Sequence, residues 1–148
     1  MGSLTNKDYD KLIKKASPNS TLFKDMLMSF ITGGIICSIG QIILHFIKGM
    51  GFSTEYSSGA TSIIMIFLGS FLTSLTIYDK IANYGKSGTL VPITGFANSV
   101  VSAAMEFKSE GYIMGVGAKM FTIAGPVLVF GTISSVICGI IYYFFYFI

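Results

Sequence analysis

The sequence predicts an all-α polytopic membrane protein with three full transmembrane helices plus a broken or re-entrant pair of half-helices. The 148 residues are 52% hydrophobic and only 11% charged, whereas an ordinary soluble domain carries about 25% charged residues. Mean hydropathy is +0.71, so the chain has too few charged groups to cover itself in water. Three apolar runs are long enough to cross a bilayer, and the length suits one domain. We expect a polar arm over residues 1–21 and a membrane domain over residues 22–148.

The N-terminal arm is polar and has no apolar core of its own. We therefore expect a partly ordered arm or a short surface helix, and not a cleavable signal peptide. The arm carries four lysines, and Lys24 follows at the membrane edge. By the positive-inside rule these lysines predict a cytoplasmic N-terminus.

The first span is predicted over about Leu22 to Ile47. Small and polar residues follow one another along it at helical spacing, namely Gly34, Ser38, Gln41 and His45. Gln41 lies near mid-span, where a polar side chain is costly against lipid. We therefore expect Gln41 to face protein or water.

The second span is predicted over Ala60 to Ile77, a segment free of charge. A short loop from Lys48 to Gly59 connects the first two spans in this interpretation. The second span ends at Tyr78-Asp79-Lys80, with the tyrosine as an interfacial anchor. Asn83 to Thr89 is expected to be a glycine-containing loop.

A half-length helix is predicted from Pro92 to Glu106, since proline suits the first turn of a helix. It holds about a dozen weakly polar residues, or about 20 Å of helix, against the roughly 20 residues that a spanning helix needs. One face of it carries Gly95, Asn98, Ser99, Ser102 and Glu106. Two interpretations stay open: a loop with a short interfacial helix whose small residues allow close packing, or a re-entrant helix that lines a water-filled path.

The C-terminal segment from Tyr112 to Ile148 is too long for one span. Gly125-Pro126 is expected to break its hydrogen-bond ladder, which gives a second half-helix over Tyr112–Ala124 and a full span over about Val127–Tyr146. The sequence leaves open whether the 91–124 unit crosses the membrane, and hence on which side the C-terminus lies.

Lys119 places a charge among apolar residues. A lysine at the bilayer centre costs roughly 2.5–3.5 kcal/mol on insertion scales. Lys119 therefore needs a carboxylate partner, a water-filled cavity or a route for its stem to the surface, and Glu106 and Glu110 are its natural carboxylate partners. Either such an ion pair pins the two half-helices together, or Lys119 is the cationic group of a permeation path with both acids at its mouth. The candidate conduit or gate residues are Gln41, Pro92, Gly95, Asn98, Ser99, Ser102, Glu106, Glu110 and Lys119.

The sequence offers no arrangement for catalysis. No serine, histidine and acid stand in plausible register, and His45 has no second ligand at metal-binding spacing. Cys37 and Cys138 each lie inside an apolar run and are expected to be buried hydrophobic residues. We predict no catalytic residue, no metal, no cofactor and no enzymatic activity. A formal net charge of +3 without clustered basic and aromatic residues gives no argument for nucleic acid.

Several segments carry a resemblance to a known family, namely Gly33–Gln41, Tyr78–Lys80, Pro92–Ser99 and Glu106–Gly111. From about Phe23 to Gly131 the chain resembles the stage V sporulation protein AC/AEb family of spore-forming bacteria. The match is co-linear over most of the chain, although it includes no metal or catalytic signature.

The resemblance implies a function and a setting. The chain would be a multi-pass protein of the spore (forespore) inner membrane and a subunit of a mechanosensitive channel for dipicolinic acid with calcium. Uptake would occur in sporulation and release in germination. The implied partners are membrane lipid, a related AEb-like membrane protein and a soluble AD-like protein, in a homo- or hetero-oligomer. The alternative is a non-conducting structural subunit that assembles or positions a membrane transport complex.

Overall fold

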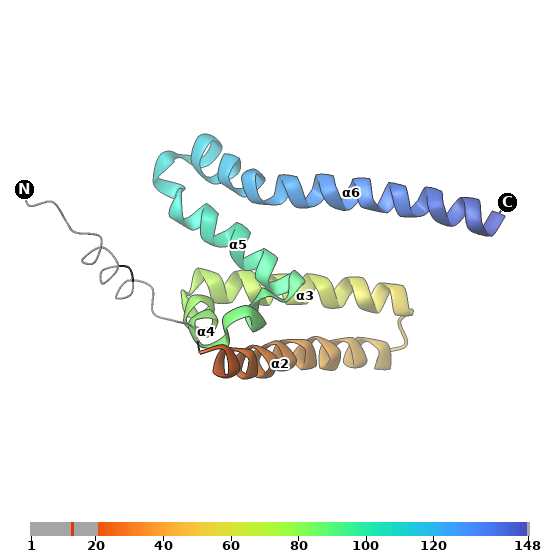
Figure 1. Ribbon diagram of the computed structural model, residues 1–148, viewed down its shortest axis with the longest axis horizontal. Coiled ribbons are helices and arrows are strands. Elements are labelled where there is room, and N and C mark those ends of the chain that lie inside the picture. The colour runs from red at the N-terminus through yellow and green to blue at the C-terminus, as the bar shows by residue number, and fades with distance from the viewer. Residues whose placement is uncertain (1–12, 14–20, 148) are drawn as a thin grey trace, which may run out of the picture.

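The computed structural model describes residue 13 and residues 21–147, and every element in these ranges is helical (Figure 1). The predictions for the polar arm therefore fall almost entirely outside the described residues. In chain order the elements are α2 (Leu22–Gly49), α3 (Thr54–Ser74), α4 (Ile77–Gly85), the 3₁₀ helix η1 (Lys86–Leu90), α5 (Pro92–Glu106), the 3₁₀ helix η2 (Lys108–Glu110), the π-helix η3 (Tyr112–Gly117) and α6 (Ala118–Phe147).

Three helices are long and apolar enough to cross a membrane: α2, α3 and the continuous run Tyr112–Tyr146. This confirms the predicted all-α fold class with three full spans. The first span is confirmed to within two residues of its predicted end, and α5 has the bounds predicted for the first half-helix.

The turn between α2 and α3 is shorter than predicted, because α3 begins at Thr54 and not at Ala60. Ser53 caps the helix by accepting a hydrogen bond from the Tyr56 backbone N–H at 3.3 Å. Glu55 lies in the first turn, where the helix dipole favours a negative charge. The predicted loop over Lys48–Gly59 is therefore wrong for its second half.

α4, η1 and α5 form a re-entrant unit, which we define as residues 77–106. α3 ends at Ser74, and Thr76, with φ of 57°, turns the chain into α4. η1 then packs against α2. α5 begins beside the middle of α3 and runs in the same direction as α3, and Asn98 of α5 is hydrogen-bonded to Thr73 of α3. The re-entrant unit therefore begins and ends on the same side of the molecule, the side where α3 ends (Figure 1). Its path puts Tyr78, which was predicted to be an interfacial anchor, in a buried position with 4% of its surface exposed.

The predicted break at Gly125-Pro126 is wrong, because α6 continues through Pro126 from Ala118 to Phe147. Proline removes one hydrogen bond from the ladder. Leaving the helix at membrane depth would strand several backbone groups in lipid, so the apolar flanks keep the helix intact. The second half-helix and the third span are consequently one long segment that begins at Tyr112.

The positions of the long helices bear on the side of the membrane on which the C-terminus lies, which the sequence left open. α6 starts on the side of the molecule where α3 ends and runs back toward the side of the α2–α3 turn, so α2 begins on one side and α6 ends on the other (Figure 1). Of the 91–124 unit, residues 91–111 contain no helix long enough to be a candidate span, and residues 112–124 are the start of the third long helix.

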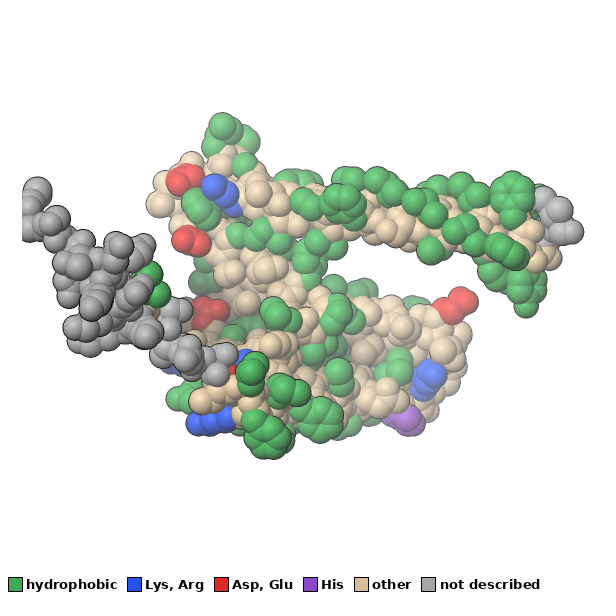
Figure 2. Space-filling model, viewed as in Figure 1, with side chains coloured by type: hydrophobic (Ala, Val, Ile, Leu, Met, Phe, Trp, Pro, Cys, Tyr) green, Lys and Arg blue, Asp and Glu red, His purple; other side chains and the backbone are tan. Residues whose placement is uncertain are grey.

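The part of α6 beyond the proline is not packed within this chain. Every residue from 126 to 146 is exposed, and Figure 2 shows open space between this part of α6 and the α2–α3 pair. Cys37 and Cys138, which were predicted to be buried, are both exposed, since this chain does not cover the helix faces that carry them.

Candidate functional site

The polar side of α5 faces α3 along a contact that we call the α3–α5 seam. Residues four apart on a helix share a face, and on α5 these are Thr94, Asn98, Ser102 and Glu106. Thr94 packs against Gly69 of α3, Asn98 bonds to Thr73, and the last two line a cavity with the end of α3. The predicted polar face of α5 is thereby directed at a neighbouring span.

The middle of the seam is a buried hydrogen-bond pair. Thr73 has 2% of its surface exposed, and its hydroxyl oxygen lies 2.7 Å from the Gly69 carbonyl oxygen and 2.8 Å from Asn98 Oδ1. A buried polar group without a partner costs free energy. The single hydroxyl proton of Thr73 can be donated to only one of these two acceptors at a time, and the contact with Asn98 joins α3 to α5. Asn98 therefore has a defined partner at membrane depth, which the sequence alone did not identify.

A cavity of about 230 Å³ opens at the end of the seam, and we call it the seam cavity. It is lined by Thr73, Thr76, Asp79, Ser102, Met105 and Glu106. Both residues that carry its carboxylates are exposed, so this end of the seam is open at the surface of the chain. Hydroxyl and carboxylate oxygens are suited to hold water and cations.

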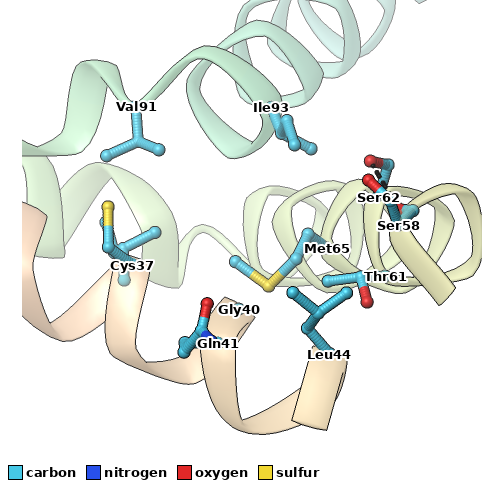
Figure 3. Close-up of a pocket in the computed structure, with 11 residues that line it drawn as sticks. Cys37, Gly40, Gln41, Leu44, Ser58, Thr61, Ser62, Met65, Val91 and Ile93 are labelled. Carbon is cyan, nitrogen blue, oxygen red and sulfur yellow. Dashed lines mark hydrogen bonds between the residues drawn. The ribbon is translucent and has the colours of Figure 1, made fainter. Parts of the chain in front are cut away.

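A second cavity, of about 260 Å³, lies between α2, α3 and the start of α5 (Figure 3). We call it the hairpin cavity. Gln41 lines it from α2, Ser62 and Met65 line it from α3, and Val91 and Ile93 lie across from them on the chain segment that starts α5. Gln41, predicted to face protein or water, thus lies at this cavity and not at the seam, and its amide nitrogen is 3.2 Å from His45 Nδ1.

The remaining small residues of the predicted face shape the backbone. Pro92 is the first residue of α5. A Cβ added at Gly95 would lie 2.9 Å from the Thr89 carbonyl oxygen, so a glycine is needed for this close approach. The Ser99 hydroxyl donates to the Phe96 carbonyl oxygen at 2.8 Å. None of the three lines the seam cavity or the hairpin cavity.

The predicted ion pair of Lys119 with Glu106 or Glu110 is wrong. Its Nζ lies 4.1 Å from the centre of the Phe107 ring, a cation–π contact worth about 0.5–2 kcal/mol. Among the residues that the structure describes, Lys119 makes no ion pair. It stands in the first turn of α6, close to the η2 turn where Glu110 is exposed. The face of the Phe107 ring is thus the contact that the structure gives the Lys119 ammonium group.

Sequence reasoning missed the residues that hold the re-entrant unit in place. The Tyr78 hydroxyl donates to the Thr89 carbonyl oxygen at 2.8 Å and lies 3.3 Å from Thr94 Oγ1. Thr94 stands four residues before Asn98, and this spacing was the available signal. No pattern in the sequence indicated that Tyr78 is buried, because its burial depends on where η1 folds back.

Comparison with known proteins gives two matches. Residues 25–141 match the family model described as SpoVAC/SpoVAEB sporulation membrane protein. The chain is 38% identical over 135 residues to stage V sporulation protein AC of Bacillus subtilis (strain 168), and the match covers 90% of each chain. No solved structure matches it.

Proposed function

This chain belongs to the SpoVAC/SpoVAEB family of sporulation membrane proteins, and on that premise we propose that it is a subunit of a spore inner-membrane channel. The proposed solute is dipicolinic acid with calcium, taken up in sporulation and released in germination, and the proposed stimulus is membrane tension. Solute and stimulus come from the resemblance to the family. The proposed wall of the path rests on the geometry of α3 and α5.

The observation that carries the proposal is the polar seam. α5 has 15 residues, about 22 Å at 1.5 Å per residue, which is too short to cross a bilayer. Non-helical backbone and polar side chains at membrane depth are tolerated where they are buried in protein or line water. The seam does both, since it is buried at Thr73 and opens into a cavity at Glu106.

The chemistry of the seam suits a charged, oxygen-rich solute. Asn98 and Ser102 offer amide and hydroxyl groups, and Asp79 and Glu106 offer carboxylates to a cation. Lys119 supplies a positive charge close to the turn that follows α5. Arginine is absent, so a carboxylate of the solute would meet lysine, hydroxyl or backbone N–H groups and not a bidentate fork.

We propose that the conduit forms between subunits. Three spans and one re-entrant unit leave no room for a pore as wide as a pyridine ring within one chain. The proposed neighbours are further copies of this chain or a related AEb-like membrane protein, with an AD-like soluble protein on the cytoplasmic side. The lysines near the N-terminus favour a cytoplasmic location for that end. We propose no catalytic role.

The test is the conductance of the purified protein in liposome patches under controlled tension. The wild type is expected to give tension-activated currents. Lys119→Ala and Glu106→Gln are expected to shift the reversal potential in opposite directions, because they remove opposite charges from one mouth. Glu55→Gln, which removes a carboxylate at the far end of α3, is the matched control and is expected to leave selectivity unchanged.

Two results would contradict the proposal. One is the absence of current from well-folded protein both alone and together with the AEb-like partner. The other is a wild-type current whose selectivity changes no more with Glu106→Gln than with Glu55→Gln. The second result would remove the seam cavity from the path.

A structural subunit that assembles or positions a transport complex is the second candidate. The observation in its favour is the unpacked length of α6, in which every residue from 126 to 146 is exposed. In that case Asn98→Ala and Lys119→Ala would lower protein level or complex formation before they affect permeation. Thiol labelling distinguishes the two candidates, because Ser102→Cys in a Cys-free background reacts with a water-soluble reagent only if the seam cavity is wet.

A further inference from the structure

We propose that the contact of Gly69 with α5 is the gate of the path, and that it separates the seam cavity from the hairpin cavity. This inference rests on the proposed channel function. It assigns gating to Met65, Gly69, Thr94 and Ala97, a set distinct from the charged residues at the mouth.

The two cavities lie at different levels of the same helix. Ser62 and Met65 of α3 line the hairpin cavity, and Thr73 and Thr76 line the seam cavity. The residues between Met65 and Thr73 span about 12 Å at 1.5 Å per residue. α5 accompanies this interval, since Ile93 borders one cavity and Ser102 the other. A route along α3 that passed through both cavities would have to cross this interval.

The interval is closed by backbone packing. A Cβ added at Gly69 would lie 3.1 Å from the Thr94 carbonyl oxygen, 3.2 Å from Thr94 Cα and 3.5 Å from Ala97 Cβ. The exposed fractions of Met65 and Ala97 are 7% and 6%. An added methyl group would already be in tight contact with α5, so neither water nor a solute fits between Gly69 and α5, and the described conformation is closed. Passage requires α5 to separate from α3.

The chain on either side of α5 carries the backbone conformations that such a separation would use. Lys86, the first residue of η1, has φ of 48°, and Gly111, after η2, has φ of 96°. A left-handed conformation is costly for a residue with a side chain, and Lys86 adopts it at the start of the segment that carries α5. These two positions are the expected pivots.

Gly69→Ala tests the gate because it is expected to favour the open state. The added methyl group meets backbone atoms of α5, which cannot rotate away, so it pushes the two helices apart and destabilises the closed state. We expect the open probability at low tension to rise about 10-fold, because overpacking of this kind shifts an equilibrium by roughly one order of magnitude. Gly59→Ala, on the same helix with no atom within 4 Å of the added Cβ, is the matched control and is expected to behave as wild type.

Thiol accessibility tests the barrier without any current. In a Cys37→Ala, Cys138→Ala background, Ser62→Cys and Thr76→Cys are expected to react with a water-soluble thiol reagent. Thr94→Cys, at a position 5% exposed, is expected to stay protected. Adding Gly69→Ala is expected to raise the labelling rate of Thr94→Cys at least several-fold, and adding Gly59→Ala is not.

The outcomes separate this inference from the channel proposal. Wild-type currents with equal open probabilities for Gly69→Ala and Gly59→Ala would overturn the gate and leave the channel in place. Rapid labelling of Thr94→Cys in the otherwise unchanged protein would overturn the barrier whether or not current flows. A protected Thr94→Cys that Gly69→Ala exposes supports the barrier, even where the isolated chain conducts nothing and the channel proposal fails.

Discussion

Tyr78 holds together three parts of the re-entrant unit through one hydroxyl group. Its ring is buried at the start of α4, and its oxygen meets the Thr89 carbonyl group of η1 and the Thr94 side chain of α5. The Thr89 side chain is itself occupied by a bond to the Lys86 carbonyl oxygen. No other described hydrogen bond reaches the Thr89 carbonyl group from outside its own helix.

Tyr78→Phe is expected to lower stability by about 1–2 kcal/mol, because it leaves the buried Thr89 carbonyl group without its donor. The measurement is the midpoint of thermal unfolding in detergent, with size-exclusion chromatography as the method that detects the folded protein. Tyr84→Phe removes the same atom from a side chain that is 73% exposed and is expected to leave the midpoint unchanged. Equal midpoints for the two variants would show that the Tyr78 hydroxyl stabilises nothing.

At the level of single residues, the sequence identified the polar groups of α5 but not their partners. Asn98, Ser102 and Glu106 were predicted from helical spacing, which depends only on local geometry. The partner of Asn98 is Thr73, 25 residues away, and this pairing depends on how far the re-entrant unit reaches along α3. Lys119 was assigned a carboxylate because charge is costly in lipid, but a neighbouring aromatic ring served instead.

η1 is attached to α2 by a contact that only glycine allows. A Cβ added at Gly88 would collide with the Ser29 carbonyl oxygen and would lie 2.9 Å from the Gly33 backbone nitrogen. Gly85, at the end of α4, packs against the side chain of Thr32, also on α2. The tip of the re-entrant unit is therefore pressed against the backbone of the first span.

Gly88→Ala is expected to destabilise the protein by about 3 kcal/mol or to prevent its folding, because overpacking against rigid backbone displaces the whole element. Expression level and thermal unfolding measure this effect. Gly34→Ala on α2, where no atom lies within 4 Å of the added Cβ, is the control and is expected to be neutral. A Gly88→Ala protein as stable as the control would show that η1 does not pack on α2 as described.

At the level of elements, α5 was predicted with its correct bounds, and α3 and α6 were not. Pro92 marks the start of α5 in the sequence itself, since proline favours the first turn. The early start of α3 depends on one capping bond at Ser53. The continuity of α6 through Pro126 depends on a balance between one lost hydrogen bond and the cost of exposed backbone in lipid, which residue patterns do not resolve.

The whole molecule has its two ends on opposite sides of the membrane if its three long helices are all spans. We expect a protease added to one side of sealed vesicles to remove a tag from one terminus only, and detergent to make both tags accessible. Removal of both tags from the same side of intact vesicles would mean that the 91–124 unit crosses the membrane. The sequence does not distinguish a 91–124 unit that crosses the membrane from one that does not, because the polar residues of α5 are compatible with either topology.

The re-entrant unit also imposes an order on biogenesis. α5 is too short and too polar to be accepted by lipid on its own, and its polar face has a partner only after α3 is in the bilayer. Its tip fits only against α2, so the ribosome must have delivered both helices before the unit can settle. α6, which emerges last and has few contacts with the other spans, can insert without waiting for that step. A nascent chain stalled between α3 and α6 would therefore expose the seam to quality-control proteases.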